Sequence, residues 1–232
     1  MSLEGDIFPR FRAISDYAVL AEFGEKIDET AYLEVIRLDK ALAAKPFEGF
    51  AEAVPAYVSL LVVFNPVVTD HATIEKELRS LSLHSSGTLN TGATREVKVC
   101  YDHDLAPDLQ HVATATGLQS EQVIQAHLAG DYRVIMYGFA PGYAYLGGVS
   151  KTLQLPRKPS AIRDVAAGSV LIAAGQCLVT TLKMPTGWWI IGRSPTRILT
   201  GKESHPFLFD VADQVAFKRI KRDEYETAVK MV

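Results

Sequence analysis

The sequence has very few cysteines. Its 232 residues include only Cys100 and Cys177, and each stands alone in a strand-like stretch. This scarcity excludes a disulfide-stapled scaffold, and the scattered histidines give no spacing typical of zinc ligands. We therefore expect two buried free thiols, no metal site and a cytoplasmic location. A disulfide or a nucleophilic cysteine is the alternative interpretation.

Long apolar runs and an excess of positive charge are also missing. No run reaches the roughly 18 residues that a membrane span needs. The N-terminus has no basic segment followed by an apolar core, so we expect no signal peptide. Lys and Arg number 24 against 27 Asp and Glu, a net charge of -3. A general binder of nucleic acid or of an anionic membrane needs a basic surface, so both functions are excluded.

One pattern imitates a DNA-binding motif. Ala113, Gly117 and Val123 have the spacing of a helix-turn-helix. A DNA reader needs cations to contact phosphates, and no lysine or arginine occurs between Lys98 and Arg133. We therefore interpret this stretch as a structural helical connector.

The common catalytic motifs are absent as well. Gly201-Lys202 is followed by Glu203 and has no glycine at the earlier position of a phosphate-cradling loop. Neither a Gly-x-Gly-x-x-Gly fingerprint nor a Gly-x-Ser-x-Gly elbow occurs. The sequence therefore predicts that this chain binds no cofactor of its own and that any ATP chemistry resides on another chain. Catalytic residues stay unknown at this stage.

The first part of the chain alternates strands and helices. Strand patterns cover residues 17–23, 50–54, 57–64 and 97–101, and amphipathic helices follow the capping residues Asp28 and Asp70. The order strand, helix, strand, strand, helix, strand is the split βαβ pattern. We therefore predict a ferredoxin-like α+β domain over residues 1–104.

After residue 104 the sequence pattern changes, first to short helices and then to short strands. Residues 105–131 predict two short helices that form a connector, with Gly117 as a helix stop. From residue 132 onward, short strand-like runs are punctuated by glycine and proline. We predict a β-rich domain over residues 132–232 that forms a closed or nearly closed barrel.

The strongest motif is a glycine-aromatic segment, residues 138–148. Its glycines permit close backbone approach, and Phe139, Tyr143 and Tyr145 stand among them. Such a loop lines a pocket or a partner groove; a structural turn with core aromatics is the alternative. The candidate substrate-binding residues around it are His127, Arg133, Phe139, Pro141, Gly142, Tyr143, Tyr145, Gln176, Trp188 and Arg193.

Chemistry gives some of these candidates a role. An arginine at a strand end, such as Arg193, can grip a carboxylate with its guanidinium fork. His127 titrates near neutrality and can donate or accept a hydrogen bond, although a lone helical histidine is more often a packing residue. Trp188 and Trp189 point to opposite faces of a strand, so at most one of them lines an interior pocket.

These segments resemble the family that contains the 5-oxoprolinase B subunit, allophanate hydrolase subunit 1 and the sporulation-kinase inhibitor. Its signature is close to Gly-Phe-x-Pro-Gly-Phe/Tyr-x-Tyr-Leu-Gly, which residues 138–147 match at each fixed position. The later stretches 167–170, 175–176 and 191–195 also fit. Ala166 and Thr180-Thr181 depart from the family pattern, which bears on substrate identity more than on fold.

The resemblance implies a ferredoxin-like domain followed by a cyclophilin-like β-barrel. It also implies a larger homologous partner of the C-subunit or subunit 2 type, with a third, lactam-utilisation protein as a further candidate partner. We therefore expect the smaller subunit of an ATP-dependent 5-oxoprolinase complex that acts on a small cyclic amide. In this hypothesis Arg193 or Arg133 holds the substrate carboxylate, and Gln176 or His127 bonds the amide carbonyl. The alternatives are a regulator that inhibits a sensor histidine kinase and a subunit in urea or allophanate metabolism.

Overall fold

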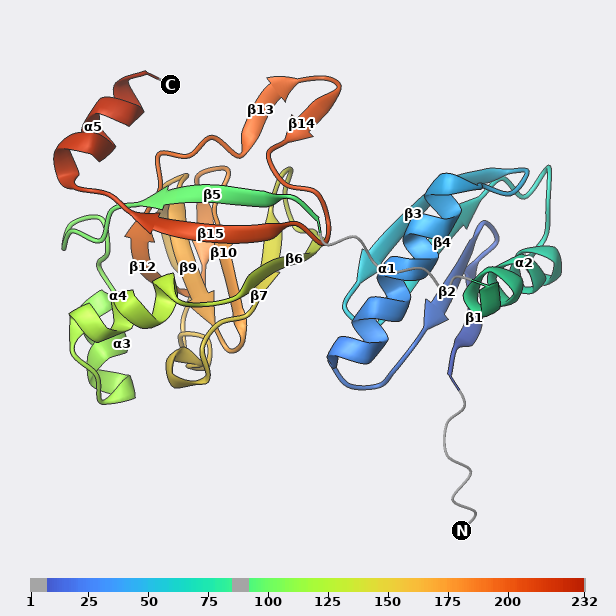
Figure 1. Cartoon of the computed structure of the whole chain (residues 1–232), viewed down its shortest axis with the longest axis horizontal. Helices are drawn as coiled ribbons and strands as arrows, with labels where there is room; N and C mark the ends of the chain where they lie inside the picture. The colour runs from blue at the N-terminus through green and yellow to red at the C-terminus, as the bar shows by residue number, and fades with distance from the viewer. Residues whose placement is uncertain (1–7, 85–91, 232) are drawn as a thin grey trace, which may run out of the picture. The chain divides into compact units, whose positions relative to one another are not determined.

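The computed structural model describes residues 8–84 and 92–231, and the chain divides into two compact units, residues 1–90 and 91–232 (Figure 1). The first unit contains β1 (Arg10–Ser15), β2 (Ala18–Glu22), α1 (Glu29–Ala44), β3 (Phe50–Ala56), β4 (Ser59–Phe64) and α2 (His71–His84). The four strands form an antiparallel sheet in the order β1-β2-β4-β3.

Both helices of the first unit begin at the predicted capping residues. The Asp28 carboxylate accepts a hydrogen bond from the Ala31 amide at 3.0 Å, and Asp70 accepts one from the Thr73 amide at 2.8 Å. These bonds satisfy amides that a helix N-terminus leaves unpaired. The apolar faces of the helices then pack against one face of the sheet, and the core consists of Val19, Ala21, Val35, Leu38, Leu42, Leu60, Val62, Phe64, Ile74 and Leu78.

The last strand predicted for this unit belongs elsewhere, so the predicted boundary at residue 104 is wrong. The strand β5 (Thr94–Val99) joins the sheet of the second unit, where it pairs in parallel with β15 (Gln214–Arg219). The split βαβ pattern would place it beside β2. That edge is occupied instead by β1, which forms an antiparallel pair with β2 from Arg10↔Glu22 onward.

The second unit is built around a seven-stranded sheet in the order β12-β9-β10-β7-β6-β15-β5. Its remaining elements are α3 (Leu109–Thr116), α4 (Ser120–Leu128), β6 (Tyr132–Tyr137), β7 (Ala144–Gly147), the 3₁₀ turn η1 (Lys151–Leu153), β8 (Ile162–Val165), β9 (Ser169–Ala173), β10 (Gln176–Val179), β11 (Met184–Thr186), β12 (Trp189–Arg193), β13 (Leu199–Lys202), β14 (His205–Phe207) and α5 (Arg222–Lys230). The pairs β8–β11 and β13–β14 are separate two-stranded sheets.

The two edges of the seven-stranded sheet meet. Cys100, just after β5, and Arg193, at the end of β12, exchange backbone hydrogen bonds of 2.8 and 2.9 Å. Gly192 makes this approach possible, because a Cβ there would lie 2.7 Å from the Val99 side chain. The sheet is thus nearly closed into a barrel, which confirms the predicted α+β class with a barrel-like second part.

The predicted connector helices belong to this second unit. Val112 of α3 and Val123 of α4 are buried in the same core cluster as the barrel residues Val134, Leu146 and Ile191, and Figure 1 shows both helices beside the barrel. Cys100 and Cys177 are buried free thiols, as predicted. No helix within the described ranges is long and apolar enough to span a membrane.

Candidate functional site

The glycine-aromatic loop, residues 138–143, connects β6 to β7 at one rim of the barrel. It is closed by backbone hydrogen bonds from Gly138 N to Tyr143 O at 3.2 Å and from Tyr143 N to Ala140 O at 3.0 Å. Phe139 has a φ of 72° and its side chain is 74% exposed. A bulky residue in this left-handed region is strained by about 1–2 kcal/mol. The loop therefore holds an aromatic ring in solvent at a conformational cost.

Gly142 anchors the loop to its surroundings. Its φ is 68°, and an added Cβ would lie 2.7 Å from the Leu199 side chain and 3.2 Å from that of Phe207. Beside it, the Thr181 hydroxyl donates a hydrogen bond of 2.8 Å to the carbonyl of Pro141. Glycine is required here both for the backbone conformation and for the close approach.

Aromatic rings continue from this loop along the barrel. The centroids of Phe139 and Tyr143 are 5.4 Å apart, those of Tyr143 and Tyr145 are 5.6 Å apart, and those of Tyr145 and Trp188 are 6.0 Å apart. The Arg157 guanidinium lies 5.6 Å from the Trp188 ring, a cation–π distance. Burial raises the pKa of Tyr143 to about 12, so its hydroxyl stays protonated at neutral pH.

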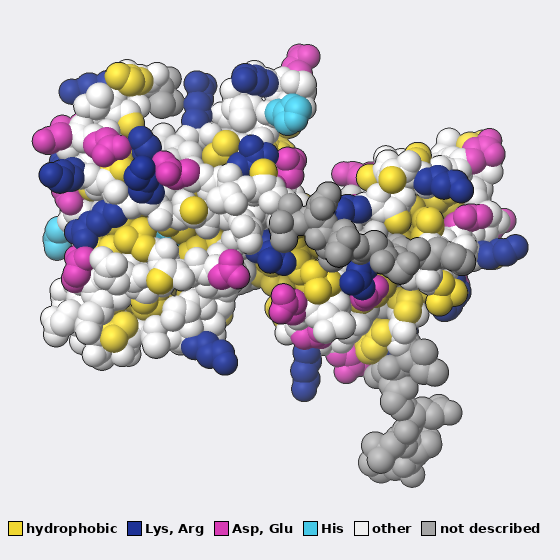
Figure 2. Space-filling model, in the orientation of Figure 1, with side chains coloured by type: hydrophobic (Ala, Val, Ile, Leu, Met, Phe, Trp, Pro, Cys, Tyr) yellow, Lys and Arg dark blue, Asp and Glu magenta, His cyan; other side chains and the backbone are white. Residues whose placement is uncertain are grey.

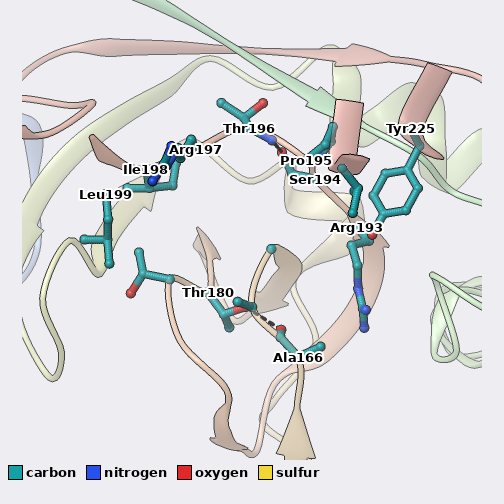
Figure 3. A pocket seen from close by; sticks show the side chains of 14 residues that line it. Ala166, Thr180, Arg193, Ser194, Pro195, Thr196, Arg197, Ile198, Leu199 and Tyr225 are labelled. Atoms are coloured by element: carbon teal, nitrogen blue, oxygen red, sulfur yellow. Dashed lines mark hydrogen bonds between the residues drawn. The ribbon is translucent and has the colours of Figure 1, made fainter. Parts of the chain in front are cut away.

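A pocket of about 630 Å³ opens at the same rim. Leu199 and Thr181 line it and also contact Gly142, so the pocket adjoins the glycine-aromatic loop. In Figure 3 Leu199 and Tyr225 stand on opposite sides of the hollow, with Thr180 and Ala166 below it and Thr196 above. The full lining is Ala166, Ala167, Gly168, Thr180, Thr181, Arg193, Ser194, Pro195, Thr196, Arg197, Ile198, Leu199, Tyr225 and Val229.

The structure brings only some of the predicted site residues together. Phe139, Pro141, Gly142 and Tyr143 lie in the loop, and Arg193 lies in the adjoining pocket. The rings of Tyr145 and Trp188 extend this group along the barrel. This set stays a predicted substrate-binding site.

Arg133 and Gln176 lie at the other end of their strands. Arg133 is near the start of β6, whereas the loop follows its end, and Gln176 begins β10, whereas Thr180 of the pocket follows its end. Each strand spans several residues at about 3.3 Å per residue. Of the two arginines proposed to hold a carboxylate, Arg193 is therefore the one that the pocket contains.

His127 is a core residue. Its side chain is fully buried, its Nδ1 lies 2.8 Å from the Tyr101 hydroxyl, and its Nε2 lies 3.6 Å from the Cys177 sulfur. Burial lowers the pKa of His127 to about 3, which keeps the ring neutral. The expected pocket role for His127 does not fit this placement, and the packing interpretation does.

Of the residues that line the pocket, sequence reasoning named only Arg193 as a candidate; those it missed include Thr180, Thr181, Arg197 and Tyr225. Arg197 follows Arg193 by four residues and could have been found from that proximity in the sequence. Tyr225 comes from α5, and nothing in its own sequence neighbourhood points to the pocket. No group of histidine, cysteine, aspartate and glutamate suited to a metal ion occurs among residues 8–84 and 92–231.

Charges of both signs are interspersed on the face drawn in Figure 2, where Lys and Arg alternate with Asp and Glu. The charged surface residues include exposed ion pairs, for example Arg222–Asp104 at 2.7 Å and Arg219–Glu121 at 2.8 Å. This face therefore shows no continuous basic area of the kind that nucleic-acid binding needs.

The fold and the site define a class, a two-unit α+β protein with a glycine-aromatic loop and an arginine-bearing pocket at one rim of a barrel. The chain belongs to the family described as carboxyltransferase domain, subdomain C and D, whose model matches residues 9–209.

Named relatives agree with this family. The 5-oxoprolinase B subunit of Bacillus subtilis (strain 168) is 34% identical over 226 residues, which cover 91% of this chain and 93% of that protein. The 5-oxoprolinase B subunit of Escherichia coli O157:H7 is 30% identical over 205 residues, which cover 88% of this chain and 93% of that protein.

Solved structures share the fold. TTHA0988 is 32% identical with a TM-score of 0.77, over 88% of this chain, which spans only 40% of that longer chain. PH0987 from Pyrococcus horikoshii is 35% identical with a TM-score of 0.56, over 93% of this chain and all of that one. The K. lactis urea amidolyase, at 16% identity and a TM-score of 0.75 over 95% of this chain and 15% of that one, shows likeness of fold alone.

Proposed function

We propose that this chain is the smaller subunit of an ATP-dependent complex that hydrolyses 5-oxoproline or a related cyclic amide. The observation that carries the proposal is the near end-to-end similarity to proteins named as the B subunit of 5-oxoprolinase. Because those relatives are named as subunits, each belongs to an assembly of several chains. By analogy, a larger homologous partner completes the site on this chain.

Two features of the chain support a divided site. The sequence has no phosphate-cradling loop, so ATP is bound by a partner. The loop also exposes Phe139 at a strained φ of 72°. Strain of this kind persists where the local conformation serves a function, and an exposed aromatic ring is typical of a contact that a partner covers. We infer that Phe139 contacts the larger subunit.

Reconstitution tests the proposal. The purified chain, the larger subunit and their mixture are each assayed with 5-oxoproline and ATP, with a lactam-utilisation protein as an added component. We expect the chain alone to be inactive and the assembled mixture to release glutamate. Hydrolysis by the chain alone would overturn the subunit proposal, and so would failure of the two chains to co-purify.

The variant Phe139→Gly tests the contact. Glycine relieves the positive φ, so the isolated chain should keep or gain about 1 kcal/mol of stability, while co-purification with the larger subunit weakens. Val67→Ser is the matched control, because Val67 is an exposed apolar side chain (91%) outside the loop, and it should leave co-purification unchanged. If both variants co-purified equally well with the larger subunit, Phe139 would not lie in the interface.

A regulator that inhibits a sensor histidine kinase is the second candidate, and the exposed Phe139 ring favours it because a helical partner could cover such a ring. Kinase autophosphorylation in the presence of the isolated chain separates the two functions. Inhibition without any hydrolysis by the assembled mixture would replace the enzyme-subunit proposal.

A further inference from the structure

The pocket at the barrel rim has an unbalanced charge. Arg193 and Arg197 line it, and no aspartate or glutamate does. Three other arginines of this unit, Arg95, Arg219 and Arg222, have acidic partners, for example Arg95 with Asp213 at 2.8 Å. Neither pocket arginine forms an ion pair with a residue in the described part of the chain. Two uncompensated cations in one hollow favour an anionic ligand.

Arg193 is held in position by the fold. Its backbone forms the two hydrogen bonds to Cys100 that close the barrel, and its side chain is half-buried. Its Nε is buried without a hydrogen-bond partner in the described ranges. A ligand oxygen that reaches the guanidinium fork would remove the free-energy cost of this unmade hydrogen bond. The side chain is thus pre-positioned for an oxyanion.

Two hydroxyl groups of the pocket donate their hydrogens to the backbone. Thr180 donates to the carbonyl of Ala166 at 2.9 Å, and Thr181 donates to that of Pro141 at 2.8 Å. These two hydroxyl hydrogens are therefore not offered to a ligand. Ser194, Thr196 and Tyr225 carry the other hydroxyl groups of the lining, and charge-assisted recognition of the anion falls to the guanidinium groups, whose planar forks match a carboxylate.

Apolar side chains form another part of the lining, and α5 contributes to it. Tyr225 and Val229 are four residues apart and lie on one face of this helix. The first turn of α5 is tethered by Arg222 to Asp104 at 2.7 Å and by Glu224 to Lys98 at 3.1 Å. Val229, one turn further, is still 47% exposed, so a ligand body could bury it. This helix lies beyond residues 9–209 that the family model matches.

We propose that this pocket binds a small organic carboxylate, with Arg193 on the carboxylate, with Arg197 adding positive charge from the other side of the hollow (Figure 3), and with Tyr225 and Val229 of α5 against the apolar body. The inference deepens the proposed function and rests on it only in that 5-oxoproline is one such carboxylate. Binding to the full chain needs neither ATP nor a partner, so its outcome is independent of the reconstitution assay.

Titration calorimetry of the full chain with cyclopentanecarboxylate, its neutral amide and inorganic phosphate tests the proposal, with 5-oxoproline as a fourth probe. We expect the carboxylate to bind about tenfold or more tightly than the amide, because the amide cannot form a charge-assisted pair with a guanidinium. Phosphate, which has no apolar body, should bind more weakly than the carboxylate. Equal binding of acid and amide, or preferential binding of phosphate, would overturn the proposal.

Variants locate the site. Arg193→Gln and Arg197→Gln should each weaken carboxylate binding about tenfold, and Val229→Asp should weaken it through charge and lost apolar contact. Arg163→Gln is the matched control, since Arg163 is an exposed arginine of β8 outside the pocket. Arg197 is exposed, so its variant keeps the test valid even if Arg193→Gln impairs folding. If Arg163→Gln weakened carboxylate binding as much as Arg197→Gln does, the carboxylate would bind outside this pocket.

Discussion

Tyr101 and His127 are joined by a hydrogen bond of 2.8 Å between the tyrosine hydroxyl and Nδ1, inside the core of the second unit. With the hydroxyl as donor, the neutral imidazole carries its proton on Nε2, which faces the Cys177 sulfur at 3.6 Å. Phe217 packs against the ring with a centroid distance of 4.4 Å. The pair satisfies two polar groups where water does not reach, so it stabilises the barrel only while His127 stays neutral.

The stability of the chain should therefore fall in mild acid. The pKa of His127 is lowered to about 3 in the folded chain and is about 6.5 in the unfolded chain. Between these two pKa values, His127 is protonated in the unfolded chain but stays neutral in the folded chain. The free energy of unfolding should thus drop by about 1.4 kcal/mol per pH unit as the pH falls below about 6.5. Urea unfolding at pH 7.5, 6.5 and 5.5 measures this slope.

The variant His127→Gln isolates the contribution of that one ring. Glutamine can still accept from Tyr101 but does not titrate, so the variant should lose stability overall and show a flatter dependence on pH. His205→Gln is the control, because His205 is exposed and its removal should leave the slope intact. A variant slope equal to the wild-type slope would contradict a neutral buried His127.

Gly142 should tolerate substitution poorly. Gly142→Ala adds both strain at φ 68° and a Cβ 2.7 Å from Leu199, so we expect a loss of about 2–4 kcal/mol. Gly201→Ala separates the two causes, because Gly201 has a φ of 74° with open space around it, and it should cost about 1 kcal/mol. Gly187→Ala, with open space and no positive φ, should be nearly neutral. Thermal unfolding of the three variants gives the order, and equal losses would refute the close-contact argument.

The ion pair between Asp108 and Lys158 should be sensitive to loss of one partner. The Nζ–Oδ2 distance is 2.5 Å, the side chains are 17% and 9% exposed, and Asp108 also accepts from the Ile190 amide at 2.7 Å. Lys158→Met leaves a poorly solvated carboxylate, at a cost of about 3 kcal/mol. Adding Asp108→Asn should restore part of this loss, as denaturant unfolding of single and double variants would measure.

An exposed pair is the comparison. Lys183 and Asp164 are 2.9 Å apart with side chains 66% and 77% exposed, and Lys183→Met should change stability by less than about 0.5 kcal/mol. If Lys158→Met lowered the stability no more than Lys183→Met does, the pair of Asp108 and Lys158 would not stabilise the chain as its geometry indicates.

Much of the architecture could be predicted from local patterns. Asp28 and Asp70 predicted helix starts because an aspartate side chain can accept hydrogen bonds from the backbone amides that a helix N-terminus leaves unpaired. The glycine-aromatic segment predicted the loop of residues 138–143, and its match to a family signature agrees with the family found by comparison. The two cysteines predicted buried thiols because isolated cysteines behave as small apolar residues.

The sequence by itself thus determined both helices and three of the four strands of the first unit, the α+β class and the position of the signature loop, because these follow from periodicity and from backbone demands within a few residues. Only the tertiary structure decided which sheet β5 joins. Its alternating valines require one buried face, but they do not say against which strand, and its partner β15 lies some 120 residues further on. The same limit applies to the pocket and to His127. Arg193, Thr180 and Tyr225 converge, and His127 is enclosed, only once the barrel closes at Cys100 and Arg193.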